Sequence, residues 1–248
     1  VKDQLDAAAK ISSVFGLTPE GVNNDLIAAS LSYKATNRQI GNIAAQVEDK
    51  TGVSGKELID FLGLIGPVAE ASGFTLEDTA ALGGTILKRS GLSGAVLADS
   101  FSRILPAISN QKNDLINLMS VSPEVAKARS SKGLNLAEAV GSGDTISTFE
   151  IIAKSYDKLN KSAQEFIVQL LGGRREAKAL LAAFGDVKGL NDLRGSLDKN
   201  ADTLEKRFGL VQQNISLVWN RIKEGFQQVV QFILSSGLGE VVTDIGRG

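Results

Sequence analysis

The side chains able to do chemistry in this 248-residue chain are carboxylates, lysines, hydroxyls and two tyrosines, because it contains no Cys and no His. Disulfides, ordinary zinc or haem sites and Cys–His or Ser–His catalysis are therefore excluded. Cleavage of a glycosidic bond would need two carboxylates about 5–10 Å apart in a cleft. Several carboxylates instead lie on polar helix faces or at expected helix starts, where they favour capping and the helix dipole: Asp60, Glu70, Glu77 and Asp78. We expect no enzymatic activity, no cofactor and no metal site.

Two motifs come close to phosphate-binding loops but lack defining residues. Gly55-Lys56 is followed by Glu57, where a phosphate loop has Ser or Thr. Gly141-Ser142-Gly143 lacks the third Gly and the preceding strand of a dinucleotide site. The densest basic run, Arg174-Arg175-Glu176-Ala177-Lys178, is interpreted as a solvated helix start. Since 27 Lys and Arg residues nearly balance 28 Asp and Glu residues, we expect no specific nucleic-acid partner.

We expect helices to carry these residues, because helical periodicity dominates the sequence and strand signals are nearly absent. A stripe of apolar and small residues from Val22 to Val47 steps by four and three, which predicts one helix of about 25–30 residues. A kink or break is expected at Pro67, and an interruption near Pro106. Further helices are predicted over Leu58–Ala71, Leu76–Ser90 and Leu97–Leu118.

A recurring Gly-apolar-(Ser/Thr/Asn) unit separates the short helices. Its Gly suits the left-handed position that ends one helix, and its polar residue can cap the next. Glu57 and Glu138 complete capping boxes, and Asp78 does so approximately. Whether the units form a degenerate repeat or only reuse a common joint stays open. The joint glycines are Gly16, Gly52, Gly73, Gly91 and Gly133, and a later helix is ended by Gly172 and Gly173.

Two long heptad helices are predicted after residue 143. The first ends at Gly172-Gly173 and precedes a smaller helix over 174–184 and a turn-rich stretch over 185–191. The second begins at Leu204 and carries more apolar residues than a two-stranded seam needs. Their stripes predict self-association in three or more copies, or packing inside one globular bundle. The stripe residues are Phe149, Ile152, Tyr156, Leu159, Phe166, Leu170, Leu204, Phe208, Val211, Ile215, Val218, Ile222, Phe226, Val229 and Ile233.

The sequence thus predicts an all-α chain: an array of short Gly-punctuated amphipathic helices flanked by long heptad helices, self-associating as a coiled coil or helical bundle. Four segments are expected. They are an N-terminal helical segment (1–50), a core of short helices (51–140), a heptad helix with a Gly-Arg-rich turn and an Ala/Leu helix (141–185), and a C-terminal long helix (186–248). Because the chain opens with Val1, we expect it to be part of a longer protein.

Two stretches resemble the core region of bacteriophage tail tape measure proteins. The first is Ala71-Ser72-Gly73-Phe74-Thr75-Leu76-Glu77-Asp78-Thr79-Ala80-Ala81-Leu82, followed by Gly91-Leu92-Ser93-Gly94 with Ala98 and Leu105. The second is Leu171-Gly172-Gly173-Arg174-Arg175-Glu176-Ala177-Lys178-Ala179-Leu180-Leu181-Ala182, after a helix with Leu159, Gln164 and Phe166. The resemblance covers roughly residues 49–185, and the chain is much shorter than that family's members.

The resemblance implies a structural role in the virion. Several copies would run along the tail tube lumen, set tail length during assembly in the host cytoplasm, and leave with the DNA at genome ejection. The implied partners are tail tube and tail tip proteins, tail assembly chaperones, and the host membrane at ejection.

Two other functions are weighed against this one. A membrane-active or pore-forming protein would use Leu58–Ala69 and Val229–Leu238, although neither reaches the roughly 18–20 apolar residues of a membrane span. A carbohydrate-cleaving enzyme on a helical scaffold would use a carboxylate pair.

Overall fold

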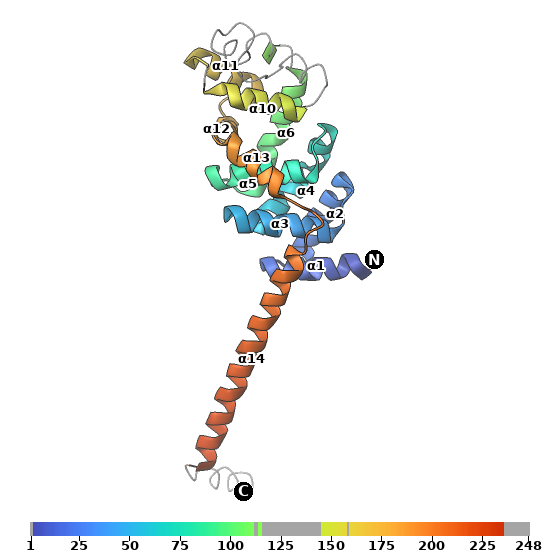
Figure 1. The fold of residues 1–248 in the computed structure, drawn as a ribbon, viewed down its shortest axis with the longest axis vertical. Coiled ribbons are helices and arrows are strands. Elements are labelled where there is room, and N and C mark those ends of the chain that lie inside the picture. The colour runs from blue at the N-terminus through green and yellow to red at the C-terminus, as the bar shows by residue number, and fades with distance from the viewer. Residues whose placement is uncertain (1, 112–113, 116–144, 158, 236–248) are drawn as a thin grey trace, which may run out of the picture. The chain divides into compact units, whose positions relative to one another are not determined.

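The computed structural model describes residues 2–111, 114–115, 145–157 and 159–235. Regular structure in these residues is α-helical throughout, which confirms the all-α prediction (Figure 1). By its internal contacts the chain divides into two units, Val1–Leu204 and Glu205–Gly248. The described parts of the first three expected segments lie in the first unit, together with residues 186–204.

Helices of the first unit pack on one another in succession. Helix α3 packs on α1, α5 packs on α3, α12 and α13 pack on α5, and α10 packs on α12 (Figure 1). Helix α4 makes its most extensive contacts with α2 and α6. The helices are α1 (Lys2–Phe15), α2 (Pro19–Tyr33), α3 (Asn37–Thr51), α4 (Gly55–Ala71), α5 (Leu76–Ser90), α6 (Gly94–Asn110), α10 (Thr145–Tyr156), α11 (Lys161–Leu171), α12 (Ala177–Phe184), α13 (Val187–Ser196) and α14 (Thr203–Ser235).

The described glycine joints end helices as predicted. Gly52 and Gly91 follow α3 and α5 in the left-handed conformation, with φ of 75° and 62°. This conformation costs glycine little because it has no Cβ. Gly16, Gly73, Gly172 and Gly173 also have positive φ. Gly133 lies outside the described residues.

Capping confirms one predicted box and corrects another. Thr75 and Asp78 form a complete capping box at the start of α5. Ser54 makes no side-chain cap on α4, so the box predicted with Glu57 is wrong. The Glu57 carboxylate instead accepts a hydrogen bond from the Gly94 N–H at the start of α6. A carboxylate of α4 therefore fixes the beginning of its neighbouring helix. Glu138 lies outside the described residues.

Both internal prolines are accommodated within helices. Helix α4 continues through Pro67 to Ala71, so of the kink or break predicted there the break does not occur. Helix α6 continues through Pro106 to Asn110, so the interruption predicted there is wrong. An internal proline costs about 3 kcal/mol, whereas burying one large apolar side chain contributes about 1.5–3 kcal/mol. Burial of five such side chains on α4 outweighs the proline: Leu58, Ile59, Phe61, Leu62 and Ile65.

The long stripe from Val22 to Val47 is divided between two helices, contrary to the single helix predicted. Lys34 ends α2 in the left-handed conformation, with φ of 50°. Thr36 then begins α3 through a capping box with Gln39. In this box, the side chains of Thr36 and Gln39 each accept from the other residue's backbone N–H, a group that a continuous helix would satisfy internally.

The stripe from Phe149 to Leu170 is also broken, between α10 and α11. The Asn160 side chain accepts a hydrogen bond from the Ala163 N–H and so caps α11. The Gln164 amide donates to the carbonyl oxygens of Tyr156 and Leu159 after α10, and the Tyr156 oxygen also accepts from the Leu159 N–H.

Helix α13 replaces the turn-rich stretch predicted over 185–191. The Asp186 side chain accepts from the Gly189 N–H, and this cap begins a helix that runs through Gly189 and Asn191. The smaller helix predicted over 174–184 begins at Ala177, since residues 172–176 form turns.

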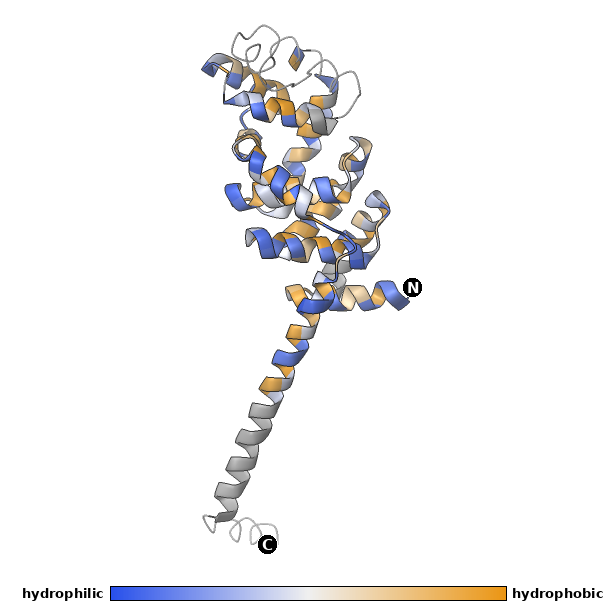
Figure 2. Cartoon of the chain, viewed as in Figure 1, coloured by the Kyte–Doolittle hydropathy of each residue, from blue (hydrophilic) through white to orange (hydrophobic). Residues whose placement is uncertain are grey.

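The core is continuous through the described first unit. Apolar residues concentrate on the helix sides that face other helices (Figure 2). Aromatic rings connect three helices at one end of this core. Phe149 of α10 lies between Phe101 of α6 and Phe184 of α12, with ring centroids 6.4 Å and 5.6 Å apart, and Tyr156 lies 5.0 Å from Phe184.

Candidate functional site

Residues 172–176, the Gly-Arg turn, are tied to α6 by ion pairs. Glu176 is almost completely buried, and its Oε1 lies 2.6 Å from Nη1 of Arg103. Asp99 lies 2.6 Å from Arg103 and 2.9 Å from Arg175. Arg175, predicted as part of a solvated helix start, is exposed but paired, and Glu176 is its buried neighbour. The carboxylates of Glu176 and Asp99 therefore pair with two of the guanidinium groups that a phosphate could use, those of Arg103 and Arg175.

Arg103→Ala is expected to lower the free energy of unfolding by about 2 kcal/mol, because it leaves the buried Glu176 carboxylate without its closest partner. Arg103 is itself 42% exposed, which reduces the loss below that of a fully buried pair. Urea denaturation followed by circular dichroism measures the change. As a control, Arg38→Ala removes the exposed pair with Asp202 and should cost below about 0.5 kcal/mol. Equal losses in the two variants would contradict the assignment.

Residues 197–202, the anchoring loop, lie between α13 and α14 and are held by two polar side chains of α3. The Asn42 amide donates to the Lys199 carbonyl, and its oxygen accepts from the Leu204 N–H. The Gln46 amide donates to the Asp198 carbonyl at 2.7 Å and accepts from the Asp198 N–H at 3.0 Å. Both side chains are buried. Asn42 thus caps the start of α14 from a position 162 residues earlier.

Two exposed side chains of α3 add to this anchor. Arg38 pairs with Asp202, and the Gln39 amide donates to Asn200. Neither Asn42 nor Gln46 was singled out from the sequence, since their partners lie more than 150 residues away. Each directly precedes a stripe residue of α3, Ile43 or Val47, and a polar type beside an apolar stripe was the only available signal.

Among the stripe residues predicted for α14, those whose side chains are described are exposed beyond its first turns. Leu204 is buried in the first unit, and Phe208 and Val211 are partly exposed. Ile215 and Val218 are 52% and 55% exposed. Three further large apolar side chains are more than half exposed on this helix: Leu210, Leu217 and Trp219. The side chains of Ile222, Phe226, Val229 and Ile233 lie outside the described set.

Most of the earlier stripe is covered by the chain itself. Phe149, Ile152, Tyr156 and Leu159 are buried in the first unit. Phe166 is 48% exposed, and Leu170 is partly buried against the core. Phe166 and the exposed Leu181 line one groove with Tyr156 and Arg174. On this stripe, only α11 presents a large exposed apolar residue to a partner.

Asp25 and Asp60 form the closest approach to an acid–base pair. They share a side-chain hydrogen bond, and Lys56 lies 2.5 Å from Asp60. Burial, followed by the charge of Asp60, raises the pKa of Asp25. Glycoside hydrolysis needs two carboxylates about 5–10 Å apart in a cleft. Here Asp60 is already paired with Lys56, and its charge also acts on Asp25.

Asp25→Asn should raise the free energy of unfolding at pH 7 by roughly 0.5 kcal/mol, since the group is only partly buried. An acid whose pKa is raised on folding favours the folded state below its unfolded pKa, and this contribution is lost as pH rises through the folded pKa. The stability gain of the variant should therefore disappear below about pH 4. Denaturation at pH 3.5 and pH 7 tests it, and a gain that persists at low pH would contradict the titration of Asp25.

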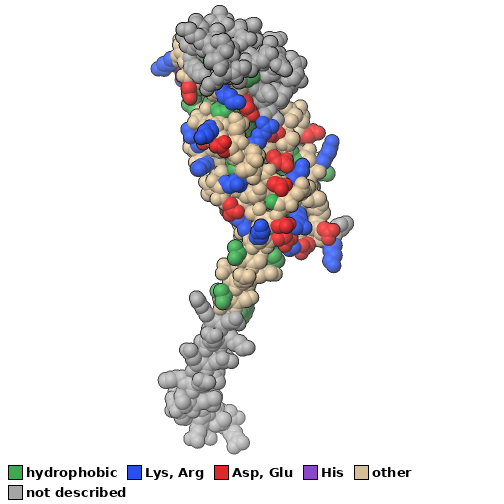
Figure 3. All heavy atoms as spheres, in the orientation of Figure 1, with side chains coloured by type: hydrophobic (Ala, Val, Ile, Leu, Met, Phe, Trp, Pro, Cys, Tyr) green, Lys and Arg blue, Asp and Glu red, His purple; other side chains and the backbone are tan. Residues whose placement is uncertain are grey.

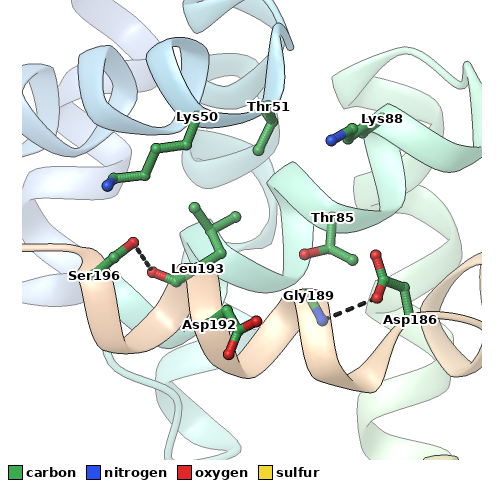
Figure 4. A pocket seen from close by; sticks show the side chains of 9 residues that line it. All are labelled: Lys50, Thr51, Thr85, Lys88, Asp186, Gly189, Asp192, Leu193 and Ser196. Atoms are coloured by element: carbon green, nitrogen blue, oxygen red, sulfur yellow. Dashed lines mark hydrogen bonds between the residues drawn. The ribbon is translucent and has the colours of Figure 1, made fainter.

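A polar depression lies between α3, α5 and α13 (Figure 4). Lys50 and Lys88 extend from α3 and α5, while Asp186 and Asp192 belong to the start and middle of α13. Asp186 is already engaged in capping α13 through the Gly189 N–H. Charges of both signs around a capped helix start indicate a solvated joint between helices.

Among the described residues, no group of three potential ligands could hold a metal ion. No helix in that part of the chain is long and apolar enough to cross a membrane. On the face shown in Figure 3, acidic and basic side chains alternate over the helices instead of gathering by sign.

The arrangement of a packed helical unit followed by a long helix with an exposed apolar stripe suits a structural component. A family model described as phage-related minor tail protein matches residues 1–173. The chain belongs to this family. The minor tail protein match covers α1 to α11 and ends within the Gly-Arg turn, so α12, α13 and α14 lie beyond it. Searches of curated proteins and of solved structures find no match. Membership of this family identifies the chain as a phage tail protein.

Proposed function

We propose that this chain is a segment of a tail tape measure protein, and that α14 contributes to a helical ruler in the tail tube lumen. The observation that carries the proposal is α14, one uninterrupted helix of 33 residues. At about 1.5 Å per residue it spans about 50 Å. Family membership and the two stretches that resemble tape measure cores support the same role.

The exposed stripe of α14 supports self-association as part of this proposal. Apolar residues that recur by threes and fours favour helices of the same period, and further copies of this chain supply them. Leu217 and Trp219 broaden the stripe beyond a two-stranded seam, which favours three or more copies. The described first unit would then pack its own core while α14 packs with other copies.

The proposed role is structural and not enzymatic. The segment would reside in the tail lumen or tip of the virion after assembly in the host cytoplasm, and would leave at genome ejection. Its partners would be tail tube and tip proteins, tail assembly chaperones, and host membrane at ejection. A nearly balanced charge avoids strong attachment to DNA that must pass the same channel.

Deletion of residues 208–228 from the phage gene tests the proposal. These 21 residues are three heptads, so the stripe keeps its register. Val229 then takes the position of Phe208 and becomes the next stripe residue after Leu204. We expect tails shorter by about 30 Å in electron micrographs. A length-preserving control, Leu210→Ala with Leu217→Ala, should leave tail length unchanged. Tails of parental length in the deletion would overturn the ruler role and leave a tip or assembly anchor.

A further inference from the structure

Joints between the described helices fall into two kinds. Most contain a glycine, as at Gly52, Gly73 and Gly91, which ends the helix through its own backbone. Three joints contain neither Gly nor Pro: residues 34–36, residues 157–160 and the anchoring loop. The three sequences thus lack the two residue types that disfavour a helix most strongly.

The apolar stripe continues through each joint of the second kind. The stripes from Val22 to Val47 and from Phe149 to Leu170 cross the first two joints without a missed step. The third stripe crosses the anchoring loop by steps of 3, 4, 4, 3 and 4, through Leu190, Leu193, Leu197, Ala201, Leu204 and Phe208. Such periodicity predicts a single amphipathic helix that continues through the joint.

At these joints, side-chain hydrogen bonds and one left-handed residue, Lys34, keep the two helices separate without Gly or Pro. Residues 34–36 depend on a left-handed Lys34 and the Thr36–Gln39 box, and residues 157–160 on Asn160 and Gln164. The anchoring loop depends on Asn42 and Gln46, which take the hydrogen-bonding places of helical neighbours. In a continuous helix the same backbone groups would pair four residues along the chain.

We infer that these three joints are conversion points, at which the compact first unit extends by fusing α2 with α3, α10 with α11, and α13 with α14. A fused α13–α14 runs over 187–235 and spans about 74 Å. Extension uncovers Leu190 and Leu193, which are buried in the compact unit. It therefore requires apolar surfaces that receive the stripe, such as other copies of the same fused helix. Fusion of these helices is a property of the chain itself and does not depend on the ruler function.

The anchoring loop offers the sharpest test because its residues Asp198, Asn200 and Asp202 are exposed. Changing these three to Ala raises helix propensity and removes the partners of Arg38 and Gln39 without touching the core. A second variant, Asn42→Ala with Gln46→Ala, removes the anchor from the α3 side. Carbon-13 chemical shifts of the backbone of the full chain report the conformation of each residue from 197 to 203.

Leu197 is extended in the compact unit, with ψ of 135°. In both variants we expect the Cα shifts of 197–203 to move to helical values, and the effect to grow when the variants are combined. The control Ile43→Ala weakens α3 between the two anchor residues without removing a hydrogen bond to the loop, and should leave Leu197 extended. Shifts of 197–203 that become those of an unstructured chain, in variants whose other helices persist, would overturn the inference. Helical shifts in Ile43→Ala alone would overturn the role of the anchor.

Discussion

Gly94→Ala is expected to lower the free energy of unfolding of the first unit by about 3 kcal/mol, because α6 begins against the backbone of α4. A Cβ at Gly94 would lie 2.0 Å from the carbonyl oxygen of Glu57 and 3.0 Å from the Phe61 nitrogen. Neither backbone atom can move without shifting α4, whose Glu57 carboxylate also accepts from the Gly94 N–H. Urea denaturation followed by circular dichroism measures the loss.

Gly195→Ala is the matched control for this substitution. Gly195 lies within α13, and a Cβ there would meet nothing within 4 Å. Alanine should therefore stabilise the unit by about 0.5–1 kcal/mol through helix propensity alone. If the Gly94 variant were as stable as the Gly195 variant, the close approach of α4 and α6 would be wrong.

If the full chain self-associates through α14 as proposed, Ile215→Asp combined with Val218→Asp is expected to weaken that association strongly. Both side chains are more than half exposed on the α14 stripe, and a carboxylate in an apolar seam is strongly disfavoured. We expect the dissociation constant to rise by at least about 100-fold, which corresponds to about 2.7 kcal/mol. Sedimentation velocity over a range of concentrations measures it, and helix content by circular dichroism shows whether α14 persists.

Gln213→Asp with Ser216→Asp carries the same charge at the same spacing. These positions are rotated by about 200° from the first pair, on the other side of the helix. The control should associate like the parent chain. Equal dissociation of both variants would mean that net charge, and not the stripe, governs association.

Local signals made part of this fold predictable from the sequence. The joints at Gly73 and Gly91 combine a left-handed glycine with a nearby polar cap, Thr75 and Ser93, and both requirements are met within a few residues. Helix α5 begins and ends at the predicted residues, Leu76 and Ser90, because a capping box and a glycine bound it.

Contacts between residues far apart in the sequence determine features of the fold that local patterns did not predict. The apolar period continues through residues 34–36 and 157–160, so it does not locate the breaks, which depend on the caps at Thr36 and Asn160 and on packing of the separated helices. Glu57 caps α6 through Gly94, 37 residues later, and Asn42 caps α14 through Leu204, 162 residues later. A capping prediction limited to local spacing assigned Glu57 to its own helix and did not identify Asn42 at all.

The candidate site shows the same division. The α14 stripe was predictable because its period is uninterrupted and its helix has no competing joint. The burial of Phe149, Ile152 and Tyr156 was not, because one apolar stripe serves equally for a core or for a partner helix. Ring contacts with Phe101 and Phe184 resolve these residues as core.

Tail length across a heptad series most directly tests whether α14 is part of a ruler. Phage carrying two- and three-heptad deletions and two- and four-heptad insertions in α14 would be compared in electron micrographs of intact tails. The account predicts a straight line of tail length against residue number, with a slope of about 1.5 Å per residue. Tails of constant length across the series, assembled at normal yield, would contradict it.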